Sequence, residues 1–122
     1  MNMNEIMTAS REKLPLIQVV INNHVLGMVR QWQSLFYNQH YSATVLDDGA
    51  DFVKIAEGMG AKAKRVTTRE EFEQAFKEAL DCKEPYVLDC IINCDDKVWP
   101  MVAPGAPINE AFDENDLKNK KK

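Results

Sequence analysis

The sequence is poor in the residues that build disulfide frameworks and zinc sites. Cysteine occurs three times, at Cys82, Cys90 and Cys94, and histidine twice, at His24 and His40. The three cysteines have no CxxC spacing and no second cluster to pair with, so they match neither a zinc-ligand pattern nor a disulfide scaffold. We therefore expect buried or idle thiols in a reducing compartment, rather than a metal site.

Long hydrophobic runs are also absent. The longest apolar stretch, residues 14–21, falls well short of the ~20 residues that a membrane-spanning helix needs. The first residues lack the basic segment and the apolar segment of a secretory signal peptide. The sequence therefore predicts no membrane partner and a cytoplasmic protein.

The sequence also has no excess of positive charge. Fifteen Lys and Arg residues face nineteen Asp and Glu residues, for a formal charge of -4, which gives no general attraction to nucleic acid. With 122 residues, of which 45% are hydrophobic and 28% charged, the composition is typical of one globular domain with its own core. We expect no nucleic-acid partner.

Hydrophobic patterning predicts three strands. Residues 16–21 and 86–92 are runs of apolar, often β-branched residues, interrupted only by Gln18 and Asp89, and are typical of strands covered on both faces in a parallel sheet. Residues 61–66 form a shorter candidate, whose lysines favour a position at the edge of the sheet.

Helical periodicity occupies the segments between these strands. Thr68 followed by Glu71 is a capping-box pattern at the start of the last of these helices. We expect helices over residues 2–13, 26–37, 50–59 and 69–82. Helices alternating with strands predict a three-layer α/β/α fold with an open, mainly parallel sheet.

The C-terminal part is expected to be irregular. Residues 99–108 contain three prolines and a glycine, too many for regular structure, and residues 116–122 are polar and end in three lysines. We therefore divide the chain into a domain over residues 1–110, with an arm over about 95–110, and a polar tail over 111–122, which we expect to be frayed from residue 116.

The loop after the first strand is the main candidate site, because ligands of open α/β sheets bind beyond the carboxyl ends of the strands. Residues 94–105, after the last strand, are a second such segment. Asn23 can offer an amide oxygen to Mg²⁺, but no carboxylate stands beside it, so the site is incomplete. Gly27 permits close backbone approach, and a helix that begins there would favour a phosphate. The alternative is a plain turn followed by a helix whose Met28, Val29 and Trp32 are core residues.

The same loop resembles a known motif. Residues 20–32, VINNHVLGMVRQW, followed by Leu35-Phe36-Tyr37, resemble the second half of the thiamine diphosphate motif of acetolactate synthase catalytic subunits. The resemblance continues through residues 51–56 (DFVKIA), 85–89 (PYVLD) and 98–106 (VWPMVAPGA), and covers the chain up to about Glu110. It implies a thiamine-diphosphate-binding fold.

The resemblance also implies roles for individual residues. Asn23 would bind Mg²⁺ through its side chain, and Val25 through its backbone carbonyl. Trp32, with Met28 and Val29, would line the substrate channel, where the tryptophan influences selectivity for 2-ketobutyrate over pyruvate. The cofactor-binding residues would be Asn23, Val25, Leu26, Gly27, Met28 and Val29, and the segment would hold no catalytic residue.

The family condenses pyruvate with a second 2-ketoacid, pyruvate or 2-ketobutyrate, with release of CO₂, in branched-chain amino acid biosynthesis. Its cofactors are thiamine diphosphate, Mg²⁺ and FAD, the last bound mainly by other domains. The implied partners are the rest of the catalytic subunit, a homodimer or homotetramer, and a regulatory small subunit. The family motif begins with Gly-Asp-Gly, which this sequence lacks, so we expect a fold truncated at its N-terminus and inactive alone.

Two alternatives remain at this point. One is another thiamine-dependent 2-ketoacid enzyme, of the pyruvate oxidase or glyoxylate carboligase type, although Trp32 and the Trp99-Pro100-Met101 arm favour acetolactate synthase. The other is a non-catalytic α/β module that binds a partner protein.

Overall fold

A three-stranded parallel sheet forms the centre of the fold. The computed structural model describes residues 2–46 and 49–119. The strands are β1 (Ile17–Asn22), β2 (Lys62–Val66) and β3 (Tyr86–Ile91), in the order β1-β3-β2. Ile17 and Lys62 are both in register with Tyr86, so the first residues of all three strands lie side by side.

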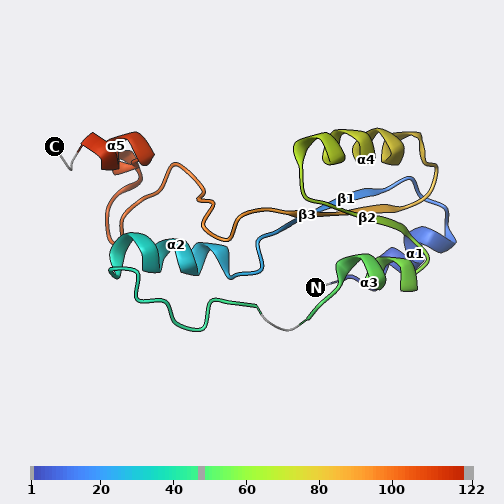
Figure 1. Cartoon of the computed structure of the whole chain (residues 1–122), viewed down its shortest axis with the longest axis horizontal. Coiled ribbons are helices and arrows are strands. Elements are labelled where there is room, and N and C mark those ends of the chain that lie inside the picture. The colour runs from blue at the N-terminus through green and yellow to red at the C-terminus, as the bar shows by residue number, and fades with distance from the viewer. Residues whose placement is uncertain (1, 47–48, 120–122) are drawn as a thin grey trace.

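Helices cover both faces of this sheet, as Figure 1 shows. On one face lies α4 (Arg69–Asp81), and on the other lie α1 (Glu5–Arg11) and α3 (Phe52–Gly58). The predicted three-layer α/β/α arrangement is therefore confirmed. None of the helices in the described ranges is long and apolar enough to cross a membrane.

The core has two halves, which share the central strand. Leu88 and its alternate neighbours on β3 pack toward α4, against Val66, Ala75 and Ala79. Val87 faces the other way and packs against Ala56 and Ala61. The prediction that the last strand is covered on both faces is confirmed, since Tyr86 through Cys90 are all buried.

The same prediction is wrong for the first strand. Val19 is 38% exposed and Ile21 is 62% exposed, because β1 lies at the edge of the sheet and α4 packs over the other two strands. A run of β-branched residues specifies an extended segment that suits burial, but it does not specify how many neighbours the strand has.

The strand β2 lies at the opposite edge, as its lysines predict. Lys62 Nζ lies 3.2 Å from Glu84 Oε2, and Lys64 Nζ lies 3.2 Å from Glu78 Oε2. The predicted capping box is also present, because Thr68 Oγ1 accepts the Glu71 N–H at 3.2 Å while Glu71 Oε2 accepts the Thr68 N–H.

The helix α2 (Gly27–Phe36) lies apart from the sheet, beside the C-terminal segment (Figure 1). That segment contains a short 3-10 helix, Ile108–Glu110, and a final helix, α5 (Glu114–Asn119). The expectation of a frayed tail from residue 116 is wrong for 116–119, because Asp113 Oδ1 accepts the Asn115 and Asp116 N–H groups and caps α5. Residues 120–122 of the predicted tail lie outside the described residues.

Candidate cofactor site

The loop between β1 and α2 is a tight polar turn. The Asn22 Oδ1 accepts the His24 N–H at 3.1 Å, and the Asn23 Oδ1 accepts the Val25 N–H at 3.2 Å. His24 has φ +56°, in the left-handed region that a residue with a Cβ adopts only where its surroundings hold it there. The two asparagine side chains therefore fix the path of the backbone through residues 22–25.

The backbone of residues 44–46 pairs with this loop. Val25 is buried and forms an isolated antiparallel bridge with Val45. The flanking bonds run from the Leu26 N–H to the Thr44 carbonyl at 2.8 Å and from the Leu46 N–H to the His24 carbonyl at 2.9 Å. In the part of the chain that the structure describes, neither bond uses the Val25 carbonyl, so that oxygen remains available to a cation.

The N-terminus of α2 begins directly after this bridge. Leu26 is at the N-cap and no side chain within the described ranges caps the helix, whose first turn also carries no acidic residue. The first N–H groups and the positive end of the helix dipole therefore favour an anion such as a phosphate. A Cβ on Gly27 would lie only 2.7 Å from Asn23 Nδ2, so glycine is needed for the Asn23 amide to lie against the helix start.

The sequence-predicted residues thus fall into two groups. Asn23, Val25 and Gly27 meet in one turn, while Met28 and Val29 project from the first turn of α2 and are 51% and 47% exposed. These exposures exclude the alternative in which Met28 and Val29 are core residues of this chain. A cavity of about 170 Å³ lies beside the turn, lined by Asn22 to Val25 and by Leu46, Ala50 and Phe52 among others.

Trp32 lies one helical turn further along, in an aromatic cluster. Its ring packs edge to face on Phe36, with centroids 5.5 Å apart, and Phe36 packs on Phe112 at 6.3 Å. Phe112 in turn contacts Trp99 of the arm at 6.0 Å. Trp32 is therefore an anchor within a cluster that joins α2 to the C-terminal segment.

Gln31 is the side chain of this helix that binds the backbone of the arm. It is 4% exposed, and its Nε2 donates to the Val98 carbonyl at 2.8 Å while its Oε1 accepts the Val98 N–H at 2.8 Å. One position earlier, Arg30 Nε donates to Asp95 Oδ1 at 2.7 Å, and Arg30 Cζ lies 4.1 Å from the centroid of the Tyr41 ring. Asp95 raises the pKa of Arg30, and Arg30 lowers that of Asp95.

Asp89 is a site residue that the sequence reasoning missed. Its fully buried carboxylate accepts from Asn22 Nδ2 at 3.0 Å and from Arg65 Nε at 2.8 Å. Arg65 also donates to Asp51 Oδ1 at 3.0 Å. The Lys54 backbone N–H, followed by the Arg65 charge, lowers the pKa of Asp51. The available signal was a carboxylate in an otherwise apolar predicted strand, since such a group is buried only with partners.

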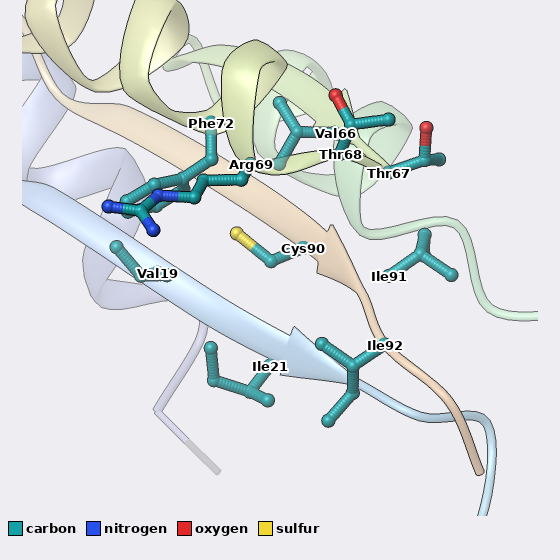
Figure 2. Close-up of a pocket in the computed structure, with 10 residues that line it drawn as sticks. All are labelled: Val19, Ile21, Val66, Thr67, Thr68, Arg69, Phe72, Cys90, Ile91 and Ile92. Atoms are coloured by element: carbon teal, nitrogen blue, oxygen red, sulfur yellow. The ribbon is translucent and has the colours of Figure 1, made fainter. Parts of the chain in front are cut away.

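A larger groove lies elsewhere, on the α4 face of the sheet. It has a volume of about 330 Å³, and Figure 2 shows its lining of mainly apolar side chains from β1, β2, β3 and α4, together with the Arg69 side chain. Its lining contains no carboxylate and only a few polar side chains, so it does not suit the binding of a diphosphate and a cation. We therefore place the candidate site at the loop rather than in the larger groove.

A protein-only metal centre is not present in the described ranges, where no group of three or more His, Cys, Asp or Glu side chains is placed to hold an ion. The loop offers two oxygen atoms, the Asn23 Oδ1 and the Val25 carbonyl, next to an uncapped helix N-terminus. Mg²⁺ commonly binds through a few protein oxygens together with substrate phosphates and water. This donor set therefore fits a magnesium-diphosphate ligand that receives further oxygens from outside the loop.

Known proteins are similar to this chain in sequence. Residues 1–90 match the family of the thiamine pyrophosphate enzyme, C-terminal TPP binding domain. The chain is 40% identical over 114 residues to the acetolactate synthase isozyme 2 large subunit of Escherichia coli K12, covering 93% of this chain and 21% of that protein. It is 44% identical over 106 residues to the acetolactate synthase large subunit of Porphyra purpurea, covering 86% of this chain and 18% of that one.

Solved structures agree with the fold. The thiamine diphosphate-dependent 4-hydroxybenzoylformate decarboxylase of Rhodococcus jostii RHA1 matches with a TM-score of 0.67 at 28% identity, over 75% of this chain and 17% of that one. A benzoylformate decarboxylase from Polynucleobacter necessarius matches equally well at 30% identity, over 77% of this chain and 18% of its own. The chain spans about a fifth of the length of the curated relatives it matches. It belongs to the family of C-terminal, thiamine-pyrophosphate-binding domains of thiamine pyrophosphate enzymes.

Proposed function

We propose that this chain is the diphosphate-binding part of an acetolactate synthase large subunit, a thiamine-diphosphate-dependent enzyme that condenses pyruvate with a second 2-ketoacid. The observation that carries the proposal is the turn of residues 23–27, in which two oxygen donors lie next to an uncapped helix N-terminus. Identities of 40–44% to acetolactate synthase large subunits over most of the chain support that choice within the family.

In this proposal the chain holds the cofactor and does not itself make bonds. Asn23 Oδ1 and the Val25 carbonyl would bind Mg²⁺, and Leu26, Gly27 and Met28 would lie along the diphosphate. Thiamine diphosphate, when bound, supplies the electron sink for decarboxylation. The residues of this chain place the phosphate end of that cofactor, and the rest of the enzyme places the reacting end. We propose that the chain alone is inactive, with no catalytic residue of its own.

The exposed first turn of α2 would contribute to the substrate channel. Met28 and Val29 project outward and Trp32 follows on the same helix, which suits a wall that a 2-ketoacid passes. The aromatic cluster holds Trp32 in a fixed orientation, a property that helps a side chain distinguish pyruvate from 2-ketobutyrate by one methylene. We also propose that the whole enzyme uses FAD and lies in the cytoplasm. Its large subunit would form an oligomer and bind a regulatory small subunit.

A titration followed by NMR tests the diphosphate site. We expect thiamine diphosphate with Mg²⁺ to shift the backbone amide signals of residues 23–29 of the labelled chain, with weak affinity because the loop supplies only part of the ligand set. Shifts confined to other residues, or tight binding comparable with a complete site, would contradict the proposal.

Two glycine variants provide a matched pair for this titration. Gly27→Ala places a methyl group 2.7 Å from Asn23 Nδ2, so we expect it to displace that side chain and weaken binding by roughly tenfold. Gly58→Ala is also in a helix but has open space around it, and we expect no change in binding. Equal binding by the two variants would contradict the proposal that Asn23 contributes to binding of the cofactor.

An enzyme assay tests the proposed dependence on the rest of the large subunit. We expect the purified chain, supplied with pyruvate, thiamine diphosphate, Mg²⁺ and FAD, to form no acetolactate above the background without protein. Acetolactate formation by the chain alone would refute the proposed inactivity while leaving the reaction class intact.

A further inference from the structure

We propose that Asp89 is a positioning residue for the cofactor loop, which it controls by fixing the direction of the hydrogen bonds that run through Asn22 to the His24 backbone. The side chains of Arg65 on β2, Asp89 on β3 and Asn22 on β1 follow one another across the sheet, and the His24 N–H comes next in the loop. Arg65 and Asn22 both donate to Asp89, and the His24 N–H donates to Asn22. We call this row the Asp89 relay.

The direction follows from the chemistry of the two side chains. A carboxylate has only acceptor atoms, whereas the asparagine amide has an acceptor oxygen on one side and a donor NH₂ on the other. Asp89 therefore selects the Asn22 orientation in which Nδ2 faces β3, and Oδ1 must then face the loop. In the opposite orientation the NH₂ group would face the His24 N–H, and two donors would meet.

The relay has a direct consequence for the site. His24 holds φ +56°, which costs energy for a residue with a Cβ, and the bond from its N–H to Asn22 Oδ1 helps to hold it there. The His24 conformation sets the direction in which the chain continues to Val25, whose carbonyl is one of the two oxygen donors. A carboxylate on the central strand thus determines where a backbone oxygen of the loop points.

Burial explains why the relay can impose one orientation. Asp89 has no solvent exposure and Asn22 is 8% exposed, so water cannot readily replace a partner that is lost. Arg65 provides the charge that a buried carboxylate requires, and Asp51 holds the guanidinium from its outer side. Each member thus has its partner, and no buried side-chain polar atom in the described ranges is left unpaired.

The test is amide hydrogen exchange of the His24 N–H, measured by NMR relative to the amides of β3. We expect Asp89→Asn to raise the exchange rate of His24 by roughly tenfold more than that of β3, because asparagine no longer dictates the orientation of Asn22. Asn22→Asp should have a similar or larger effect, since two carboxylates then face each other.

The double variant Asn22→Asp with Asp89→Asn is the decisive one. Arg65 can then donate to the new amide oxygen, the new amide can donate to the new carboxylate, and that carboxylate can accept the His24 N–H. We expect this exchange of side chains to restore protection of His24 to within about threefold of the original chain. If the fold simply required a buried carboxylate at position 89, the double variant would not restore protection of His24.

Asp51→Asn is the matched control, because it removes a charge from the outer partner of Arg65 and keeps a good N-cap residue for α3. We expect His24 exchange to remain unchanged there. Unaltered His24 protection in Asp89→Asn, or a folded double variant without protection, would overturn the relay. If Asp89→Asn alone does not fold, the double variant decides, and its failure to fold would also count against the relay.

The link to Mg²⁺ rests on the proposed function, but the exchange measurement does not. Because it is made without metal or cofactor, a relay that fails and a diphosphate site that fails give separate results. Protection of His24 that follows the relay, together with no response of residues 23–29 to thiamine diphosphate and Mg²⁺, would refute the proposed function alone.

Discussion

The two edges of the sheet are protected to very different degrees. β2 carries three cationic side chains in five residues, and Lys62, Lys64 and Arg65 each have an acidic partner. β1 carries no charge over its six residues, and Val19 and Ile21 are exposed on its α4 face. Both strands have a free side, but only one has the features of an outer edge.

The difference follows the way natural sheets avoid association. Lysines on an edge strand oppose the approach of another strand, whereas an uncharged apolar edge offers a template for pairing. β2 therefore has the composition of a true edge, and β1 has the composition of an interior strand. We therefore expect β1, rather than β2, to be the edge more prone to pair with a second copy of this chain.

The largest effect on the free energy of unfolding is expected on the central strand, and we compare it with the effect at the edge strand β1. Leu88 on the central strand is fully buried, so Leu88→Ala should lower the free energy of unfolding by about 2–5 kcal/mol. Ile21→Ala on β1 removes a mostly exposed side chain and should cost under about 0.5 kcal/mol. Urea denaturation measures both. A large loss for Ile21→Ala would mean that β1 is covered in solution.

A charge on the apolar edge tests the association directly. We expect the chain to self-associate with increasing concentration in analytical ultracentrifugation, and Ile21→Lys to weaken that association by about tenfold or more, because a lysine cannot be buried there without a partner. A monomeric original chain, or an Ile21→Lys variant that associates unchanged, would contradict the inference.

The stability of the chain should also depend on pH in the alkaline range, because of Tyr86 at the start of β3. Burial and the hydrogen bond to Glu78 raise the pKa of Tyr86 to about 12. The unfolded chain releases this proton near pH 10. Tyr86 therefore contributes stability that is complete below pH 10 and is lost as the pH rises toward 12. Urea midpoints across that range should fall more for the original chain than for Tyr86→Phe, whereas equal falls would refute the assignment.

The smallest effect is expected from removing a charge at β2. Lys64→Ile loses an exposed ion pair with Glu78, which should change the free energy of unfolding by less than about 1 kcal/mol. The same variant should increase self-association in the ultracentrifuge, because β2 then lacks one of its protecting lysines. If association stays unchanged, the remaining cations suffice to protect this edge.

Much of this architecture could be predicted from local patterns. The capping box at Thr68 and the lysines of β2 are local signals with a direct physical meaning, and both predictions are confirmed. The exposure of Ile21 could not be predicted, because a β-branched run carries no information about its neighbours. The cap on α5 also required the geometry of Asp113, since a polar tail can be either frayed or capped.

For the candidate site, the sequence indicated the residues but not their connections. Asn23, Val25 and Gly27 are adjacent in the chain, so a local motif was enough to bring them together. Asp89 lies 67 residues from Asn22 and meets it only because β1 and β3 pair in register. Long-range contacts of this kind depend on strand order, which the residues of one segment do not determine.

The Gln31 side chain has a consequence for how the arm tolerates changes in length. Its amide binds both the N–H and the carbonyl of Val98, as a peptide group of a neighbouring strand does. In an extended chain these two groups point to the same side for one residue and to the opposite side for the next. A shift of the arm by one residue at Val98 itself would therefore place a peptide group of the opposite direction against Gln31, whereas a side-chain substitution at Val98 would leave both backbone groups in place.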